Sequence, residues 1–159
     1  MPAILVALAA LQAQPVCPAA PAALPIELAG WRAARPVAAA IDAGTSAVLI
    51  VGQGVRAALH PAAHVTFPVR PAKTGPGKHG GLFAFDAGRA GRYRVALGTP
   101  GRLEVVRDGR AVTSVAHAHG PACSGIRKMV DFDLRPGRHL LEVAGAPDAS
   151  VTLLVTYLP

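Results

Sequence analysis

The stretch RLEVVRDGRAVTSV, residues 102–115, is the clearest indication of the fold. Two runs rich in apolar residues, 102–107 and 110–115, flank the dipeptide Asp108-Gly109. A type I′ turn needs positive φ at both of its central residues, and Asp-Gly is one of the pairs that adopt it readily. The stretch therefore predicts a β-hairpin closed by a two-residue turn.

The strand pattern extends in both directions from this hairpin. Upstream, Tyr93, Val95 and Leu97 share one face of a predicted strand, and arginines occupy the other. Further runs with strand patterning are residues 47–51, 55–59, 65–69, 82–85, 130–134, 139–143 and 151–157. Pro68 within the run 65–69 predicts an edge strand there. About eight or nine short strands, with turn signals between them and no strong amphipathic helix, predict an all-β fold, a single-domain β-sandwich with a jelly-roll-like arrangement.

Length and composition agree with a single β-domain, which we place at residues 31–159. The chain has 159 residues, enough to bury a substantial core. Hydrophobic residues make up 52% and aromatic residues only 4%, so the predicted core is aliphatic. The 17 glycines and 15 prolines are typical of a chain with many turns. No apolar run reaches the roughly 18 residues that a membrane-spanning helix needs, so no transmembrane segment is predicted.

The N-terminus has the pattern of a secretory signal peptide. Residues 3–11, AILVALAAL, form an apolar stretch of the right length, although no Lys or Arg precedes it. Cleavage after Ala13 gives a signal peptide of residues 1–13; cleavage after Ala22 is the alternative, and it would remove Cys17. Residues 14–30 are rich in Pro and Ala and are predicted to lie extended across the surface. The predicted location is periplasmic or secreted.

The chain contains two cysteines, Cys17 and Cys123. In an exported protein two cysteines predict one disulfide, which here would tie the mature N-terminus to a late loop. The alternative is that Cys123 is a lone thiol or a metal ligand.

Residues 117–128, HAHGPACSGIRK, are the candidate site, because this connection is long and concentrates two histidines and two cations. Histidines two apart on an extended segment project to the same side, so His117 and His119 can reach one metal ion. A third ligand would come from His79, or from His60 or His64, or from Cys123 if it is not in a disulfide. Imidazole ligands suit Cu, Zn, Fe or Ni. The alternative is a disulfide-pinned loop whose histidines are merely polar.

The formal net charge of +7 comes mainly from arginines scattered along the chain. No aromatic residues alternate with them as stacking platforms, which argues against nucleic acid as a partner and leaves an anionic envelope surface. The chain contains no G-x-S-x-G, no phosphate-binding glycine loop and no H-E-x-x-H, so a hydrolase is not indicated. Asp131 and Asp133 share a strand face and are interpreted as a solvated outer face beside Arg135.

Four segments resemble a group of short exported bacterial proteins that are often labelled homogentisate dioxygenase. The segments are YRVALG (93–98), LEVVRDG (103–109), HGPACSGIRKMVDF (119–132) and RPGRHLLEVAGAP (135–147). The resemblance implies a metal-dependent oxygenase of reduced cupin-like form that uses His117 and His119. In the cupin motif a glutamate follows His-x-His by three or four residues, whereas Cys123 and Ser124 stand there in this chain. The strand pattern is also similar to small sandwich modules attached to secreted peptidases and glycosidases.

The leading hypothesis is a periplasmic β-sandwich that binds a metal ion or a small ligand at residues 117–128. One alternative is the metal-dependent dioxygenase that the resemblance implies. The other is a structural or accessory module of the cell envelope.

Overall fold

The computed structural model describes residues 16–18, 20–21, 23–71 and 78–159. The predicted signal peptide, residues 1–13, therefore lies outside the described residues. Within them, no helix combines the length and the apolar character needed to cross a lipid bilayer.

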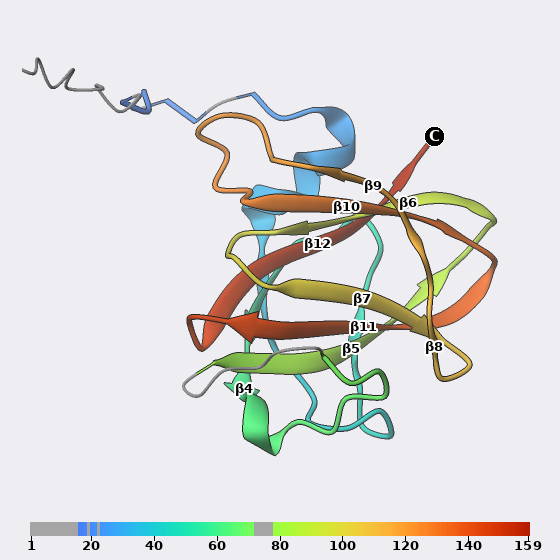
Figure 1. The fold of residues 1–159 in the computed structure, drawn as a ribbon. Coiled ribbons are helices and arrows are strands. Elements are labelled where there is room, and N and C mark those ends of the chain that lie inside the picture. The colour runs from blue at the N-terminus through green and yellow to red at the C-terminus, as the bar shows by residue number, and fades with distance from the viewer. Residues whose placement is uncertain (1–15, 19, 22, 72–77) are drawn as a thin grey trace, which may run out of the picture.

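The described strands form two sheets packed face to face, and Figure 1 shows them as two layers. The first sheet has the strand order β1 (Arg35–Ala38), β3 (Val55–Ala58), β12 (Ser150–Leu158), β6 (Gly91–Leu97), β10 (Lys128–Leu134), β9 (Ser114–Ala118). The second has the order β2 (Ala47–Leu49), β5 (His79–Ala87), β11 (Gly137–Ala146), β7 (Arg102–Arg107), β8 (Arg110–Ala111), and β4 (His60–Pro61) also pairs with β5. The predicted all-β sandwich is confirmed.

The long strands from β5 to β7 and from β10 to β12 alternate between the two sheets along the chain, which agrees with the jelly-roll-like arrangement. Most neighbouring strands are antiparallel, but β1 runs parallel to β3 and β2 runs parallel to β5. Both parallel pairs involve the early part of the chain, where β1 is the end strand of the first sheet and β2 the end strand of the second.

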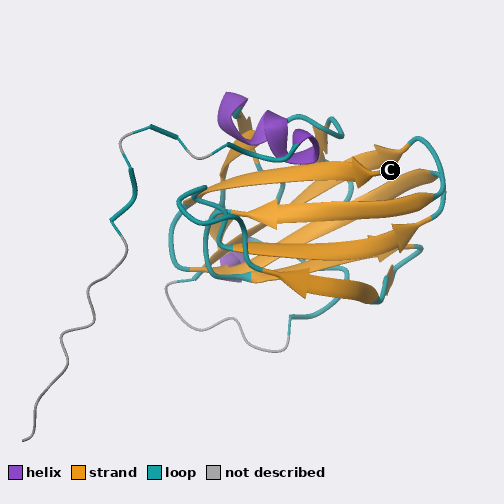
Figure 2. Ribbon diagram, turned by 90° about the horizontal axis from the view of Figure 1, so that it is seen from above, coloured by secondary structure: helices purple, strands orange, loops and turns teal. Residues whose placement is uncertain are grey.

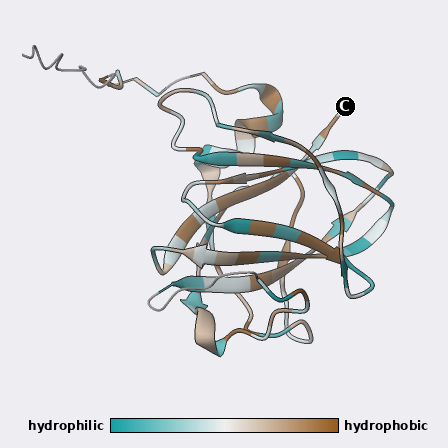
Figure 3. Ribbon diagram, viewed as in Figure 1, coloured by the Kyte–Doolittle hydropathy of each residue, from teal (hydrophilic) through white to brown (hydrophobic). Residues whose placement is uncertain are grey.

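The core lies between the sheets and follows the period-two pattern of the strands. Val95 and Phe132 of the first sheet and Phe85 and Leu141 of the second are all almost fully buried in it. Figure 3 shows apolar segments along the strands of both layers. Because alternate side chains of a strand point to the same face, each apolar set faces the opposite sheet.

The hairpin between β7 and β8 has the predicted turn. Asp108 has φ of 51° and Gly109 has φ of 73°, the positive values that a type I′ turn requires. The strand expected over residues 110–115 is divided, however. It leaves the second sheet after β8 and resumes as β9 at the edge of the first sheet, paired with β10. This crossing carries the His-x-His segment to the first sheet.

The run 65–69 is not a strand, contrary to the prediction. The short β4 and a single 3-10 turn, η2 (Ala62–His64), precede it, and the chain then crosses the outer face of the second sheet. Val65 and Phe67 pack there against Leu82. Pro68 has no backbone N–H to donate to a neighbouring strand. The apolar contacts of Val65 and Phe67 therefore hold this segment on the sheet.

The end of the Pro/Ala-rich segment is helical, whereas we predicted an extended chain up to residue 30. Residues Ile26–Ala33 form a 3-10 helix, η1, which lies on the outer face of the first sheet (Figures 1 and 2). A 3-10 helix has three residues per turn, so Leu28 and Trp31 lie on the same side of it. Both are buried against Ala96 and Leu154.

Candidate functional site

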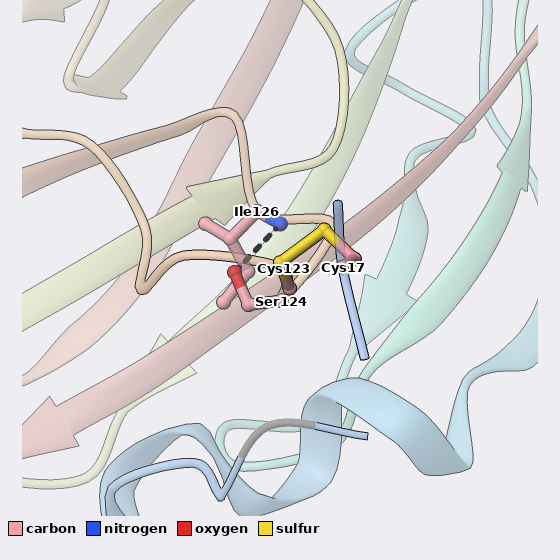
Figure 4. Close-up of a disulfide and its surroundings, with 4 residues drawn as sticks. All are labelled: Cys17, Cys123, Ser124 and Ile126. Atoms are coloured by element: carbon pink, nitrogen blue, oxygen red, sulfur yellow. Dashed lines mark hydrogen bonds between the residues drawn. A yellow bond between two sulfur atoms is a disulfide. The ribbon is translucent and has the colours of Figure 1, made fainter. Parts of the chain in front are cut away.

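The candidate site lies beside the connection between β9 and β10, which a disulfide holds in place. Cys17 and Cys123 are bonded (Figure 4), with their Cα atoms 5.5 Å apart and a separation of 106 positions in the sequence. The predicted pairing is confirmed. Because the Cys123 sulfur is in this bond, it is not a thiolate ligand in this state.

Hydrogen bonds within and around the loop add to its rigidity. The Ile126 N–H donates to Ser124 Oγ at 3.1 Å (Figure 4), and the Ser124 N–H donates to the Pro121 carbonyl oxygen at 3.1 Å. Gly120 is packed so closely that a Cβ there would lie 2.3 Å from the Cβ of Ile126. The loop therefore has a defined conformation, although most of its residues are exposed.

His119 follows β9 and has a defined ring orientation. Its Nδ1 lies 3.2 Å from the carbonyl oxygen of Arg127, across the base of the loop. A carbonyl oxygen only accepts, so Nδ1 carries the proton in this hydrogen bond. In the neutral ring, Nε2 then keeps its lone pair, which is the arrangement found in most metal-binding histidines.

His117 lies in β9 opposite Val130 of β10, and its side chain is exposed. Its Nε2 lies 2.9 Å from Oγ of Ser114, three residues earlier in the same strand. A hydroxyl can accept from Nε2–H, and Nδ1 then keeps the lone pair. With the bond in this direction, each of the two rings uses one nitrogen within the protein and has the other as a free lone pair.

Both imidazoles line one pocket of about 400 Å³, which we call the histidine pocket. Its lining residues are Pro100, Gly101, His117, Ala118, His119, Arg127 and Lys128. The turn after β6 thus forms one wall, and the two ends of the β9–β10 connection form the others. The sequence analysis did not identify the Pro100-Gly101 wall, because nothing in the local pattern links this turn to the histidines.

Lys128 contributes an oriented cation to the pocket. Its Nζ donates to the carbonyl oxygen of Gly101 at 3.0 Å. Burial lowers the pKa of Lys128, and the nearby Arg102 lowers it further, while Glu104 opposes the shift. Since no lining residue carries a carboxylate, the pocket is cationic.

The other histidines considered as ligands are elsewhere. His79 begins β5 in the second sheet, where it pairs with Pro61 and Ala146, and it does not line the histidine pocket. His60 Nε2 lies 2.9 Å from the Ala39 carbonyl oxygen, and His64 belongs to η2. In the described part of the chain, no three His, Cys, Asp or Glu side chains gather closely enough to hold a metal ion. The protein therefore brings together two of the three predicted ligands.

Asp131 and Asp133 form a ladder of ion pairs with the neighbouring strand β6. Asp131 accepts two hydrogen bonds from Arg94, at 2.7 and 2.8 Å, and Asp133 accepts two from Arg92, at 3.0 and 3.2 Å. The partners of the two aspartates are thus Arg94 and Arg92 of β6, and not Arg135, beside which we had placed them. The Arg92 hydrogen bond lowers the pKa of Asp133. Both carboxylates are engaged in holding β10 to β6.

Glu142 is a buried carboxyl group that the sequence analysis did not single out. It lies on the outer face of the second sheet, 1% exposed, and its Oε1 accepts the Val69 N–H at 2.8 Å. Burial raises its pKa to about 6, against the lowering effect of that hydrogen bond. It lies on β11 and does not line the histidine pocket, so its raised pKa affects the stability of the fold and not the candidate site.

No protein-family model and no curated protein sequence matches the chain. The functional proposal therefore rests on the histidine pocket.

Proposed function

We propose that the protein is an exported β-sandwich binding module that holds a transition-metal ion at the histidine pocket through His117 and His119. The observation that carries the proposal is the hydrogen bond from His119 Nδ1 to the Arg127 carbonyl oxygen, 3.2 Å. It fixes the tautomer in which Nε2 is a ligand, and such an outer partner is the usual companion of a metal-binding histidine.

His117 supplies the second nitrogen. In the tautomer whose Nε2–H donates to the Ser114 hydroxyl, the ring is oriented by this hydrogen bond and Nδ1 is the metal-binding atom. Both histidines line the same pocket beside a loop that the disulfide and Gly120 hold in one conformation. A preorganised pair of ligands costs less entropy on binding than a pair on a flexible loop.

Two protein ligands leave coordination positions for solvent or a small molecule. Zinc sites usually have four ligands, so about two positions stay open on such an ion. An incomplete protein ligand set is typical of sites that bind a further molecule and not of closed structural sites. This supports a binding role for the pocket.

Export is part of the proposal. The apolar stretch at residues 3–11 has the pattern of a signal peptide, and the Cys17–Cys123 disulfide suits an oxidising compartment. The disulfide also has a local role, because it fixes the loop next to His119.

Metal analysis of the purified protein tests the proposal. We expect about one transition-metal ion per chain after loading with Cu²⁺ or Zn²⁺ and dialysis, and loss of that ion in a His117→Ala/His119→Ala variant. His64→Ala, in the 3-10 turn η2, is the matched control and should keep the metal. Equal metal content in wild type and the double variant, or no metal after loading, refutes the proposal.

A further inference from the structure

The histidine pocket places two cations next to the two imidazoles. Arg127 and Lys128 line it together with His117 and His119, and the remaining lining residues are uncharged. Glu104, whose charge acts on Lys128, accepts a hydrogen bond from Arg102 at 2.9 Å and does not line the pocket. The pocket therefore has no negative charge of its own.

The two imidazoles can hold a bare divalent ion, but the two cations weaken its binding. Like charges repel, and the repulsion is stronger at a partly buried site than in bulk water. Protein sites for divalent ions commonly include a carboxylate or a thiolate, which offsets the charge of the ion. Here the disulfide occupies the one thiol of the loop, Cys123.

The two cations are arranged to hold an anion. The backbone of Arg127 is fixed on both sides, because its N–H donates to the Leu97 carbonyl oxygen at 2.8 Å and its carbonyl oxygen accepts from His119. Lys128 uses one of its three N–H groups on Gly101, which leaves two. A guanidinium and an ammonium are the side chains that bind carboxylate and phosphate oxygens most strongly.

We infer that the pocket takes its metal ion as a complex with a small chelating oxyanion, a carboxylate or a phosphate, whose oxygens fill the open coordination positions and contact Arg127 and Lys128. This inference rests on the proposed function, since His117 and His119 hold the metal. The complex satisfies both requirements of the pocket at once: the anion completes the coordination and neutralises the charge.

Equilibrium dialysis with radiolabelled anions tests the inference. Oxalate represents a carboxylate and pyrophosphate a phosphate, and each is offered alone or with equimolar CuCl₂. We expect wild-type protein to retain at least one of the two anions only when copper is present, in a ratio of about one anion per copper. The anion that is retained identifies the class of oxygen ligand.

Two charge-matched double variants locate the anion. In Arg127→Gln/Lys128→Gln, copper binding without anion should persist, while retention of the anion should fall about tenfold or more, because two charge-assisted contacts are lost. The control, Arg110→Gln/Arg138→Gln, removes the same charge from exposed positions outside the pocket and should behave as wild type.

The outcomes separate this inference from the proposed function. If copper binds but neither anion is retained, or if both double variants retain the anion equally, the inference is wrong and the metal site stands. If copper does not bind under any condition, the proposed function fails. Retention of an anion without copper, unchanged by His117→Ala/His119→Ala, would contradict both.

Discussion

The indole Nε1 of Trp31 donates a hydrogen bond to the carbonyl oxygen of Ser124 at 3.0 Å. This bond joins η1 to the loop between β9 and β10, one residue from the disulfide at Cys123. The loop beside the histidine pocket is thus attached to the N-terminal segment twice, by a covalent bond and by a buried indole. The two attachments can be removed separately.

Removing the indole donor should loosen the loop. In Trp31→Phe much of the apolar packing against Leu28 and Ile126 is retained, but the Ser124 carbonyl loses its partner. We expect a loss of about 1 kcal/mol in the free energy of unfolding, or about 3 °C in Tm. Thermal unfolding followed by circular dichroism measures it. A Tm equal to that of wild type would mean that the hydrogen bond contributes nothing.

Removing the disulfide should have a larger effect. Its cysteines are 106 positions apart in sequence, and for a closed loop of this length the chain-entropy relation gives about 5 kcal/mol. We expect Cys17→Ser/Cys123→Ser to lose up to this amount in denaturant unfolding, and wild type to behave in the same way after reduction. Reductant should leave the double variant unchanged. If it destabilises that variant too, the effect has another cause.

The strands and the disulfide were predictable because each depends on local pattern or simple pairing. Asp108-Gly109 specifies its turn through φ alone, and the alternation around Tyr93 specifies a strand face. With two cysteines, only one intramolecular pairing exists. These features need no knowledge of distant parts of the chain.

The features that were missed depend on contacts distant in sequence. Nothing within residues 110–115 indicates that the strand changes sheets at Val112; its new partner, β10, begins at Lys128. The run at Phe67 has strand composition but is held by packing on Leu82. The Pro100-Gly101 wall joins the histidines only because β6 and β10 are neighbours.

The stability of the fold should depend on pH through Glu142. Its pKa, about 6, is above the usual value of 4.5, so the folded protein binds this proton more tightly than the unfolded chain. Below about pH 4.5 Glu142 is protonated in both the folded and the unfolded state, and no charge is buried on folding. As the pH rises through about 6, the free energy of unfolding falls, because the folded protein then buries the ionised carboxylate. The cost of ionisation at pH 7.5 is about 2 kcal/mol.

Glu142→Gln should remove this dependence. The amide oxygen can still accept the Val69 N–H, and no charge is buried at pH 7.5. We expect the variant to gain stability relative to wild type between pH 4.5 and 7.5, measured by denaturant unfolding at each pH. Burial lowers the pKa of His139, which gives the opposite trend, but that residue is common to both proteins and cancels in the difference. Asp148→Asn, at an exposed site, should follow wild type at every pH.

The ion-pair ladder between β6 and β10 offers an internal comparison of burial. Asp131 faces Arg94 and Asp133 faces Arg92, in the same register and with the same paired geometry. The side chains of the first pair are 7% and 20% exposed, whereas those of the second are 58% and 47% exposed. Two pairs of the same chemistry therefore differ mainly in access to water.

Asp131→Asn should be much more destabilising than Asp133→Asn. The first change leaves the Arg94 guanidinium partly buried, with Glu27 at 4.0 Å as its one remaining carboxylate partner among the described residues, and we expect a loss of about 2 kcal/mol or more. At the second, water replaces the lost carboxylate and salt screens the pair, so little change is expected. Denaturant unfolding of both variants at low and high salt measures the difference. Equal losses would show that access to water does not determine the contribution of these two pairs.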